Sequence, residues 1–227
     1  IRLAYFPTPL GINELSLAAG ETILLLGSSG CGKSSLLKLI AGFEDPAAGD
    51  IRDGRKTALL LQNAQHQIIM QTVEDELRFP LKNAGKNTGD QQKQLDELVD
   101  TLGIRHLLDR DMNTLSFGEV QLVMIAATFL TDADIYLLDE PTSHLDPPAI
   151  RTCYDYMNCL KERGKTVCVS GQIADEYIFF DRVWIMEKGG IRADIPSDIF
   201  AATYREYGLM TDDELLGGIL QRIRSGK

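Results

Sequence analysis

Residues 27 to 34 constrain the fold of this chain more than any other segment. They read Gly27-Ser-Ser-Gly-Cys-Gly-Lys33-Ser34 and fit the pattern GxxxxGK[ST]. An apolar run, Glu21–Leu26, precedes them, and a helical pattern over Lys33–Ala41 follows. Glycines in such a turn let backbone N–H groups point inward, and the next helix directs its positive end at the same place. The segment therefore predicts a phosphate-binding loop between a buried strand and a helix.

The residue types in this loop predict distinct roles. Lys33 is expected to reach the β- and γ-phosphates of a nucleotide, and the Ser34 hydroxyl is expected to bind Mg²⁺. The other expected nucleotide contacts are Gly27, Ser28, Ser29, Gly30, Cys31, Gly32 and Ser35. A glycine-rich turn without a ligand is the alternative, but the flanking strand and helix favour the phosphate loop.

A second candidate site element is the apolar run Ile135–Leu138, which ends in Asp139 and Glu140. Asp139 is expected to belong to the Mg²⁺ shell, and Glu140 is expected to polarise the attacking water as a general base. The alternative is an ordinary strand that ends in a solvated acidic turn. A phosphate loop in the same chain makes the catalytic interpretation the better one.

The remaining patterns predict a single α/β domain. Further buried strands are expected over Thr57–Leu61, Thr166–Ser170 and Arg182–Met186, with a helix over Pro148–Glu162. Because strands and helices alternate, the sheet should be mostly parallel and covered on both faces. We expect a P-loop core over 1–62 and 132–195, an inserted helical subdomain over 63–131, and a C-terminal helical extension over 196–227.

Within the expected helical subdomain, one start and one loop can be predicted. Thr72 is a plausible N-cap for a helix through Leu77. The polar segment Asn83–Gln94 contains glycine and is expected to be an exposed loop.

Composition excludes several classes of protein. The formal net charge of −10 and the lack of any basic run argue against nucleic acid as a main ligand. The four cysteines form no CxxC pair, so neither a zinc site nor a disulfide framework is indicated. No apolar run approaches the ~20 residues that span a bilayer, so any membrane role is expected to be peripheral, from the cytoplasmic face.

Other motifs resemble those of the ATP-binding subunits of ABC transporters. Leu115-Ser-Phe-Gly-Glu119 is similar to the family signature LSGGQ, Ser143-His-Leu-Asp146 to its D-loop, and Gln62 to its Q-loop glutamine. The resemblance implies that two subunits enclose two ATP molecules with Mg²⁺. It further implies nucleotide contacts by Ser116, Gly118 and Asp146, a catalytic and metal-binding role for Gln62, and stacking of Tyr5 on adenine, with Phe6 as the rival.

A narrower resemblance concerns energy-coupling-factor and cobalt-type ATPases. The segments Gln62–Gln67 and Thr72–Phe79 are similar to their QNPxxQ and TVxxExxF motifs, and Ile195–Phe200 is similar to their C-terminal segment. Ala64 departs from the pattern, which has proline there. The resemblance implies uptake of a vitamin or metal ion, with integral membrane partners bound near Gln62–Phe79.

Two departures from the ABC pattern bear on activity. Gln172 occupies the place of the switch histidine, and the signature has Phe117 and Glu119 for a glycine and a glutamine. The alternative function is therefore a hydrolysis-impaired, nucleotide-binding regulatory subunit of a heterodimer. Both a homodimer and a heterodimer remain open, and the acidic charge argues against an ABC ATPase of DNA repair or translation.

Overall fold

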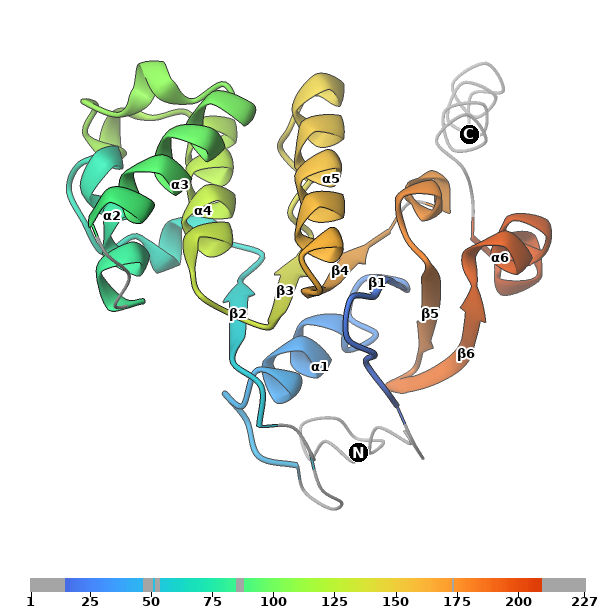
Figure 1. Cartoon of the computed structure of the whole chain (residues 1–227). Coiled ribbons are helices and arrows are strands. Elements are labelled where there is room, and N and C mark those ends of the chain that lie inside the picture. Colours follow the sequence, from blue (N-terminus) through green and yellow to red (C-terminus); the bar gives the residue numbers. More distant parts are fainter. Residues whose placement is uncertain (1–14, 47–50, 52–53, 85–87, 173, 210–227) are drawn as a thin grey trace, which may run out of the picture.

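Short apolar runs pair into one six-stranded sheet in the order β2-β3-β4-β1-β5-β6 (Figure 1). The structure is a computed structural model and describes residues 15–46, 51, 54–84, 88–172 and 174–209. The strands are β1 (Thr22–Leu26), β2 (Thr57–Leu60), β3 (Ile135–Asp139), β4 (Thr166–Gly171), β5 (Arg182–Glu187) and β6 (Gly190–Pro196). All neighbours are parallel except β5 and β6. The predicted α/β fold with a mostly parallel sheet is confirmed, whereas β6 was not predicted.

Helices cover both faces of this sheet. They are α1 (Lys33–Ile40), α2 (Val73–Asn83), α3 (Thr88–Thr101), α4 (Phe117–Leu130), α5 (Pro147–Glu162) and α6 (Ser197–Thr203). On one face, leucines of α1 join a buried cluster with alternate residues of β1 and β3. On the other face, α4 and α5 pack over the remaining residues of the same strands, as Figure 1 shows. The two faces of each strand are thus apolar, as expected for a buried parallel sheet.

The strand register brings the candidate site residues to one edge. Leu26 of β1 pairs with Gly171 of β4, and Asp139 of β3 pairs with Ser170. Since parallel strands end at the same edge, the segments after β1, β3 and β4 begin side by side. The phosphate loop, Glu140 and Gln172 follow these three strand ends directly.

The segment between β2 and β3 is helical in the part that the structure describes. Helices α2, α3 and α4 bury leucines and valines in the cluster that also covers the sheet, so the helical part and the sheet share one apolar core. The assignment of 63–131 as a distinct subdomain stays a prediction.

One start and one loop in this helical part can be compared with the sequence predictions. Thr72 does cap α2, because its hydroxyl accepts a hydrogen bond from the Asp75 N–H at 3.2 Å. The predicted loop over Asn83–Gln94 is wrong, since α2 runs to Asn83 and α3 begins at Thr88. The polar first turns of α3 bury no apolar residue and so lack the helical pattern, but tertiary contacts hold them. The Gln91 amide, for example, donates to the Leu81 carbonyl at 2.9 Å.

The predicted C-terminal helix is present as α6, followed by a short 3₁₀ helix over Tyr204–Tyr207. Residues 210–227 of the expected extension lie outside the described residues. Within the described part of the chain, no helix is both long and apolar enough to cross a bilayer.

Cysteine burial leads to a first testable prediction. Cys159 is exposed, whereas Cys31, Cys153 and Cys168 are buried and all four are free. Burial raises the pKa of the Cys153 thiol to about 12 and also raises the pKa of Cys31. We expect a disulfide reagent at pH 8 to modify one thiol quickly in the native protein and four after unfolding. Rapid modification of two or more thiols in the native protein would contradict the burial of Cys31, Cys153 and Cys168.

Candidate functional site

The phosphate loop connects β1 to α1 through a turn with left-handed backbone. Gly32 has φ 111° and precedes the first helical residue, a conformation that suits glycine. No side chain caps α1, and its first turn contains no acidic residue. The first N–H groups of this helix are therefore not engaged by a cap, which is the arrangement that favours a bound anion.

Lys33 lies buried at the base of the loop, with 5% of its side chain exposed. Its ammonium donates to the Gly27 carbonyl at 2.7 Å and lies 3.6 Å from the Glu140 carboxylate. The loop and Glu140 thus share one cation in this structure. The phosphates of a nucleotide would compete with these two partners for the same ammonium.

Glu140 contacts the other two predicted catalytic residues, Gln62 and Gln172. One carboxylate oxygen, Oε2, accepts a hydrogen bond from the Gln62 amide at 3.0 Å. The other, Oε1, accepts from the Gln172 amide at 2.8 Å and faces Lys33. Its backbone is left-handed (φ 49°), which costs an L-residue on the order of 1–2 kcal/mol. Such a turn directs the side chain away from the line of β3 and toward its three partners.

Asp139 is held by a residue that the sequence did not single out. The buried Ser170 hydroxyl donates to Asp139 Oδ1 at 2.6 Å and accepts the Glu140 N–H at 2.9 Å. Asp139 Oδ2 has no hydrogen-bond partner among the described residues. Ser170 could not be found from its own segment, because a single serine near the end of an apolar strand gives no pattern.

The oxygen donors at this edge fit Mg²⁺. Asp139 offers a carboxylate oxygen, Ser34 a hydroxyl in the first turn of α1, and Gln62 an amide carbonyl, all hard ligands. In the described part of the chain, no group of three His, Cys, Asp or Glu residues could hold a metal by itself. Such a sparse set suits a magnesium ion that is held mainly by phosphates and water.

The signature residues form the N-terminus of α4. Ser116 caps the helix, and Glu119 completes a capping box by accepting the Ser116 N–H at 2.7 Å. Glu119 also receives a hydrogen bond from Arg110 at 2.9 Å. The Ser116 N–H and hydroxyl, followed by the Arg110 charge, lower the pKa of Glu119. The unusual carboxylate is thus held at the start of its own helix, where it is paired with a cation.

Phe117 packs against the D-loop of its own chain. Its ring lies 5.4 Å from the ring of His144, although 56% of the residue is exposed. Gly118 is needed for this approach, because a Cβ there would come within 2.9 Å of the His144 carbonyl. Gln62 and Gln121 line a pocket of about 200 Å³ beside this ring pair. The ring of Phe117 therefore has a partner within its own chain.

The other predicted contacts are Asp146 and the tip of the phosphate loop, which the structure describes, and Tyr5, which it does not. Asp146 caps α5 by accepting the Ala149 N–H at 2.9 Å. Ser28, Ser29 and Gly30 are exposed at the tip of the phosphate loop. Tyr5 and its rival Phe6 lie outside the described residues, so the adenine contact stays a prediction.

Comparison with known proteins finds matches to this chain in both sequence and fold. The ABC transporter family model matches residues 11–143. The energy-coupling factor transporter ATP-binding protein EcfA1 of Latilactobacillus sakei is 33% identical over 89% of this chain and 79% of its own length. EcfA1 of Mycoplasma pneumoniae is 32% identical over 88% and 78%. An ABC transporter ATP-binding protein of Methanosarcina mazei is 32% identical over 87% of this chain, which spans only 44% of that protein.

Solved structures have the same fold. An ATP-binding subunit of an ABC transporter superposes with a TM-score of 0.80 at 24% identity and covers 97% of both chains. The cbiO1 protein of Clostridium perfringens superposes with a TM-score of 0.71 at 23% identity, over 93% of this chain and 87% of that one. The family model and the sequence relatives show that the chain belongs to the ABC transporter family of ATP-hydrolysing, ATP-binding subunits, which includes the energy-coupling factor proteins.

Proposed function

We propose that this chain binds Mg-ATP between its phosphate loop and Asp139, and that Glu140 activates the water that attacks the γ-phosphate. The two products are ADP and phosphate. This hydrolysis drives an energy-coupling-factor-type importer of a vitamin or metal ion. The chain acts at the cytoplasmic face of the membrane. The proposal draws its transport class from relatives named as energy-coupling factor proteins.

The single observation that supports hydrolysis best is the set of donors around Glu140. Gln62, Gln172 and Lys33 reach one carboxylate from three separate segments, and its left-handed backbone aims it at them. A general base must be held within hydrogen-bonding reach of its water, and such a clamp restricts the carboxylate to one place. When bound, Mg²⁺ would neutralise charge on the β- and γ-phosphates. Lys33 would contribute the fixed cation on the protein side.

The experiment is phosphate release at saturating ATP, with and without Mg²⁺, from the chain purified together with its partner subunits. We expect release that saturates with ATP and requires the metal. Phosphate release that is the same with and without Mg²⁺, or no phosphate release, would contradict the proposed activity.

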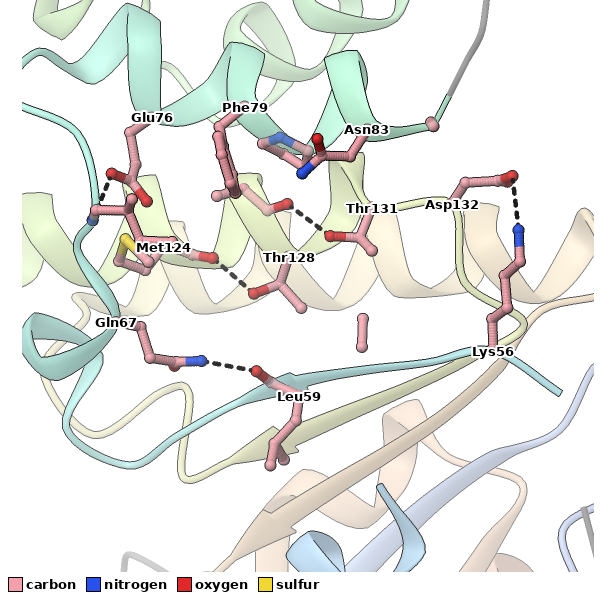
Figure 2. A pocket seen from close by; sticks show the side chains of 15 residues that line it. Lys56, Leu59, Gln67, Glu76, Phe79, Asn83, Met124, Thr128, Thr131 and Asp132 are labelled. Atoms are coloured by element: carbon pink, nitrogen blue, oxygen red, sulfur yellow. Dashed lines mark hydrogen bonds and ion pairs between the residues drawn. The ribbon is translucent and has the colours of Figure 1, made fainter. Parts of the chain in front are cut away.

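The proposed membrane partner has a candidate docking groove. A pocket of about 420 Å³ lies between α2, α4 and β2, and Figure 2 shows Phe79 of α2 and Met124 of α4 among the residues that line it. Buried Glu76 fixes one wall, because its Oε2 accepts the N–H groups of Ile69 at 3.0 Å and Met70 at 2.7 Å. Ile69 beside it is 63% exposed. A groove of this size, lined by apolar and polar side chains together and bordered by an exposed isoleucine, suits a short amphipathic helix of an integral membrane subunit.

Ile69 gives a direct test of this groove. Ile69→Glu is expected to weaken co-purification with the membrane subunits by about 10-fold or more, because one isoleucine contributes ~1.5–3 kcal/mol when buried. ATP binding should be unchanged. Ile178→Glu is the matched control, since Ile178 is 64% exposed but lies in the 3₁₀ helix after β4. If both variants lost co-purification equally, or if Ile69→Glu lost none, the groove assignment would be contradicted.

A second candidate function is a regulatory subunit that binds ATP and hydrolyses it poorly. Gln172 favours it, because a neutral amide stabilises the developing negative charge less than an imidazolium and cannot relay a proton. The clamped Glu140 opposes it. In a heterodimer, this chain would still supply Ser116 and Gly118 to the site of a partner.

Gln172→His tests how far the neutral amide of Gln172 limits hydrolysis. We expect the variant to raise phosphate release several-fold at saturating Mg-ATP, since a histidine there could donate a charged hydrogen bond to the γ-phosphate. The comparison is steady-state release by wild type and variant. Equal rates, or a slower variant, would show that the Gln172 amide already serves as a competent donor beside Glu140.

A further inference from the structure

Ser170 joins the two carboxylate residues at the end of β3. It has no exposed surface, and its hydroxyl lies 2.6 Å from Asp139 Oδ1 and 2.9 Å from the Glu140 nitrogen. A hydroxyl has one hydrogen to donate and two lone pairs that accept. Since a carboxylate can only accept and the Glu140 N–H can only donate, both hydrogen bonds of this hydroxyl have a defined direction.

The backbone of Glu140 depends on the same residue. Its N–H is shared between the Ser170 hydroxyl and the Ser170 carbonyl, the latter at 3.2 Å. Glu140 is the first residue beyond the paired part of β3, because the register of β3 with β4 ends at Asp139 and Ser170. A left-handed glutamate at a strand end persists only where neighbouring groups hold it. Ser170 supplies two such acceptors.

The hydroxyl also sets which oxygen of Asp139 is engaged within the protein. It occupies Oδ1, while Oδ2 has no hydrogen-bond partner in the described residues. One buried side chain therefore fixes the rotation of Asp139 and the backbone turn at Glu140 together. Neither contact reaches the phosphate loop.

We propose that Ser170 is a positioning residue for ATP hydrolysis, acting through Glu140 and Asp139. The inference rests on the proposed function of Glu140 as the base. Loss of the hydroxyl should leave ATP binding by Lys33 and its loop nearly unchanged, and it should lower the rate of the chemical step. Placement errors of this kind reduce kcat because the base and its water no longer meet in the reactive geometry.

The test compares Ser170→Ala with Ser170→Thr in the chain purified with its partner subunits. For Ser170→Ala we expect kcat to fall about 10- to 100-fold while KM for ATP and the calorimetric Kd change less than about 3-fold. Ser170→Thr retains the hydroxyl and should recover most of the rate. A purely structural role would not give this split between kcat and KM, nor rescue by a second hydroxyl.

Thr166→Val is the matched control. Thr166 lies on the same strand, is equally buried, and donates its hydroxyl to the Ala18 carbonyl at 2.7 Å. It sits at the opposite end of β4 from Glu140. We expect Thr166→Val to lower the melting temperature as much as Ser170→Ala does, with kcat unchanged. A similar loss of kcat in both variants would contradict a positioning role for Ser170.

Two further outcomes keep the inference distinct from the proposed function. If Ser170→Ala does not fold, Ser170→Cys takes its place, because a thiol has nearly the same shape and is a weak donor. Its kcat should fall between those of wild type and Glu140→Gln. An active wild type with a fully active Ser170→Ala or Ser170→Cys would overturn the positioning role alone. An inactive wild type would overturn the proposed function and this role with it.

Discussion

Glu140→Gln is expected to slow ATP hydrolysis by about 100-fold or more while ATP remains bound. The amide cannot take a proton from water, but it has nearly the same shape and can stay between Gln62 and Gln172. The subunits should therefore stay closed around unhydrolysed ATP. Phosphate release measures the slower hydrolysis. The mass of the ATP-bound species, measured on the same sample, shows whether the subunits stay closed around ATP.

The same substitution at a surface glutamate is the control for this prediction. Glu162→Gln lies at the exposed end of α5 and should hydrolyse ATP at the wild-type rate. Glu140 could not be the base if Glu140→Gln also kept that rate.

Lys33→Ala is expected to have the second large effect, a loss of ATP affinity of at least about 10-fold together with most turnover. Charge-assisted hydrogen bonds to phosphate are among the stronger polar contacts, and this ammonium is already buried beside the loop carbonyl of Gly27. The Kd of Mg-ATP by calorimetry measures the effect. Lys38→Ala, on the last turn of α1, should bind as the wild type does. Equal affinity and equal hydrolysis for Lys33→Ala would refute the phosphate-loop assignment.

Most of the sheet could be predicted because its strands are buried on both faces. Such strands read as continuous apolar runs, as Ile135–Leu138 does. β6 is an exposed edge strand in which Arg192 and Asp194 alternate with apolar residues. This half-buried pattern is missed by a search for continuous apolar runs. The pairing of β6 is supported from outside its own sequence, by an ion pair between Asp194 and Arg182 of β5.

Some site residues could likewise be predicted from a contiguous motif, whereas others come together only in the folded chain. The phosphate loop and the Asp139–Glu140 pair are contiguous, so their spacing alone predicts them. Gln62 and Gln172 meet Glu140 from segments far away in the chain, and only the resemblance to ABC proteins pointed to them. Ser170 has no such motif. Its importance is visible only once the register places it opposite Asp139.

The central claim is that this chain hydrolyses ATP at a site built on its own Glu140. The most direct measurement is a single turnover of ATP labelled in the γ-phosphate, with the purified subunit complex in excess over nucleotide and, where the complex holds a second, different ATPase subunit, with the general base of that subunit inactivated. We expect wild type to convert the bound ATP to ADP and phosphate, and Glu140→Gln to hold it intact over the same time. Bound ATP that stays intact in the wild type as well would contradict the claim and leave a subunit that only binds.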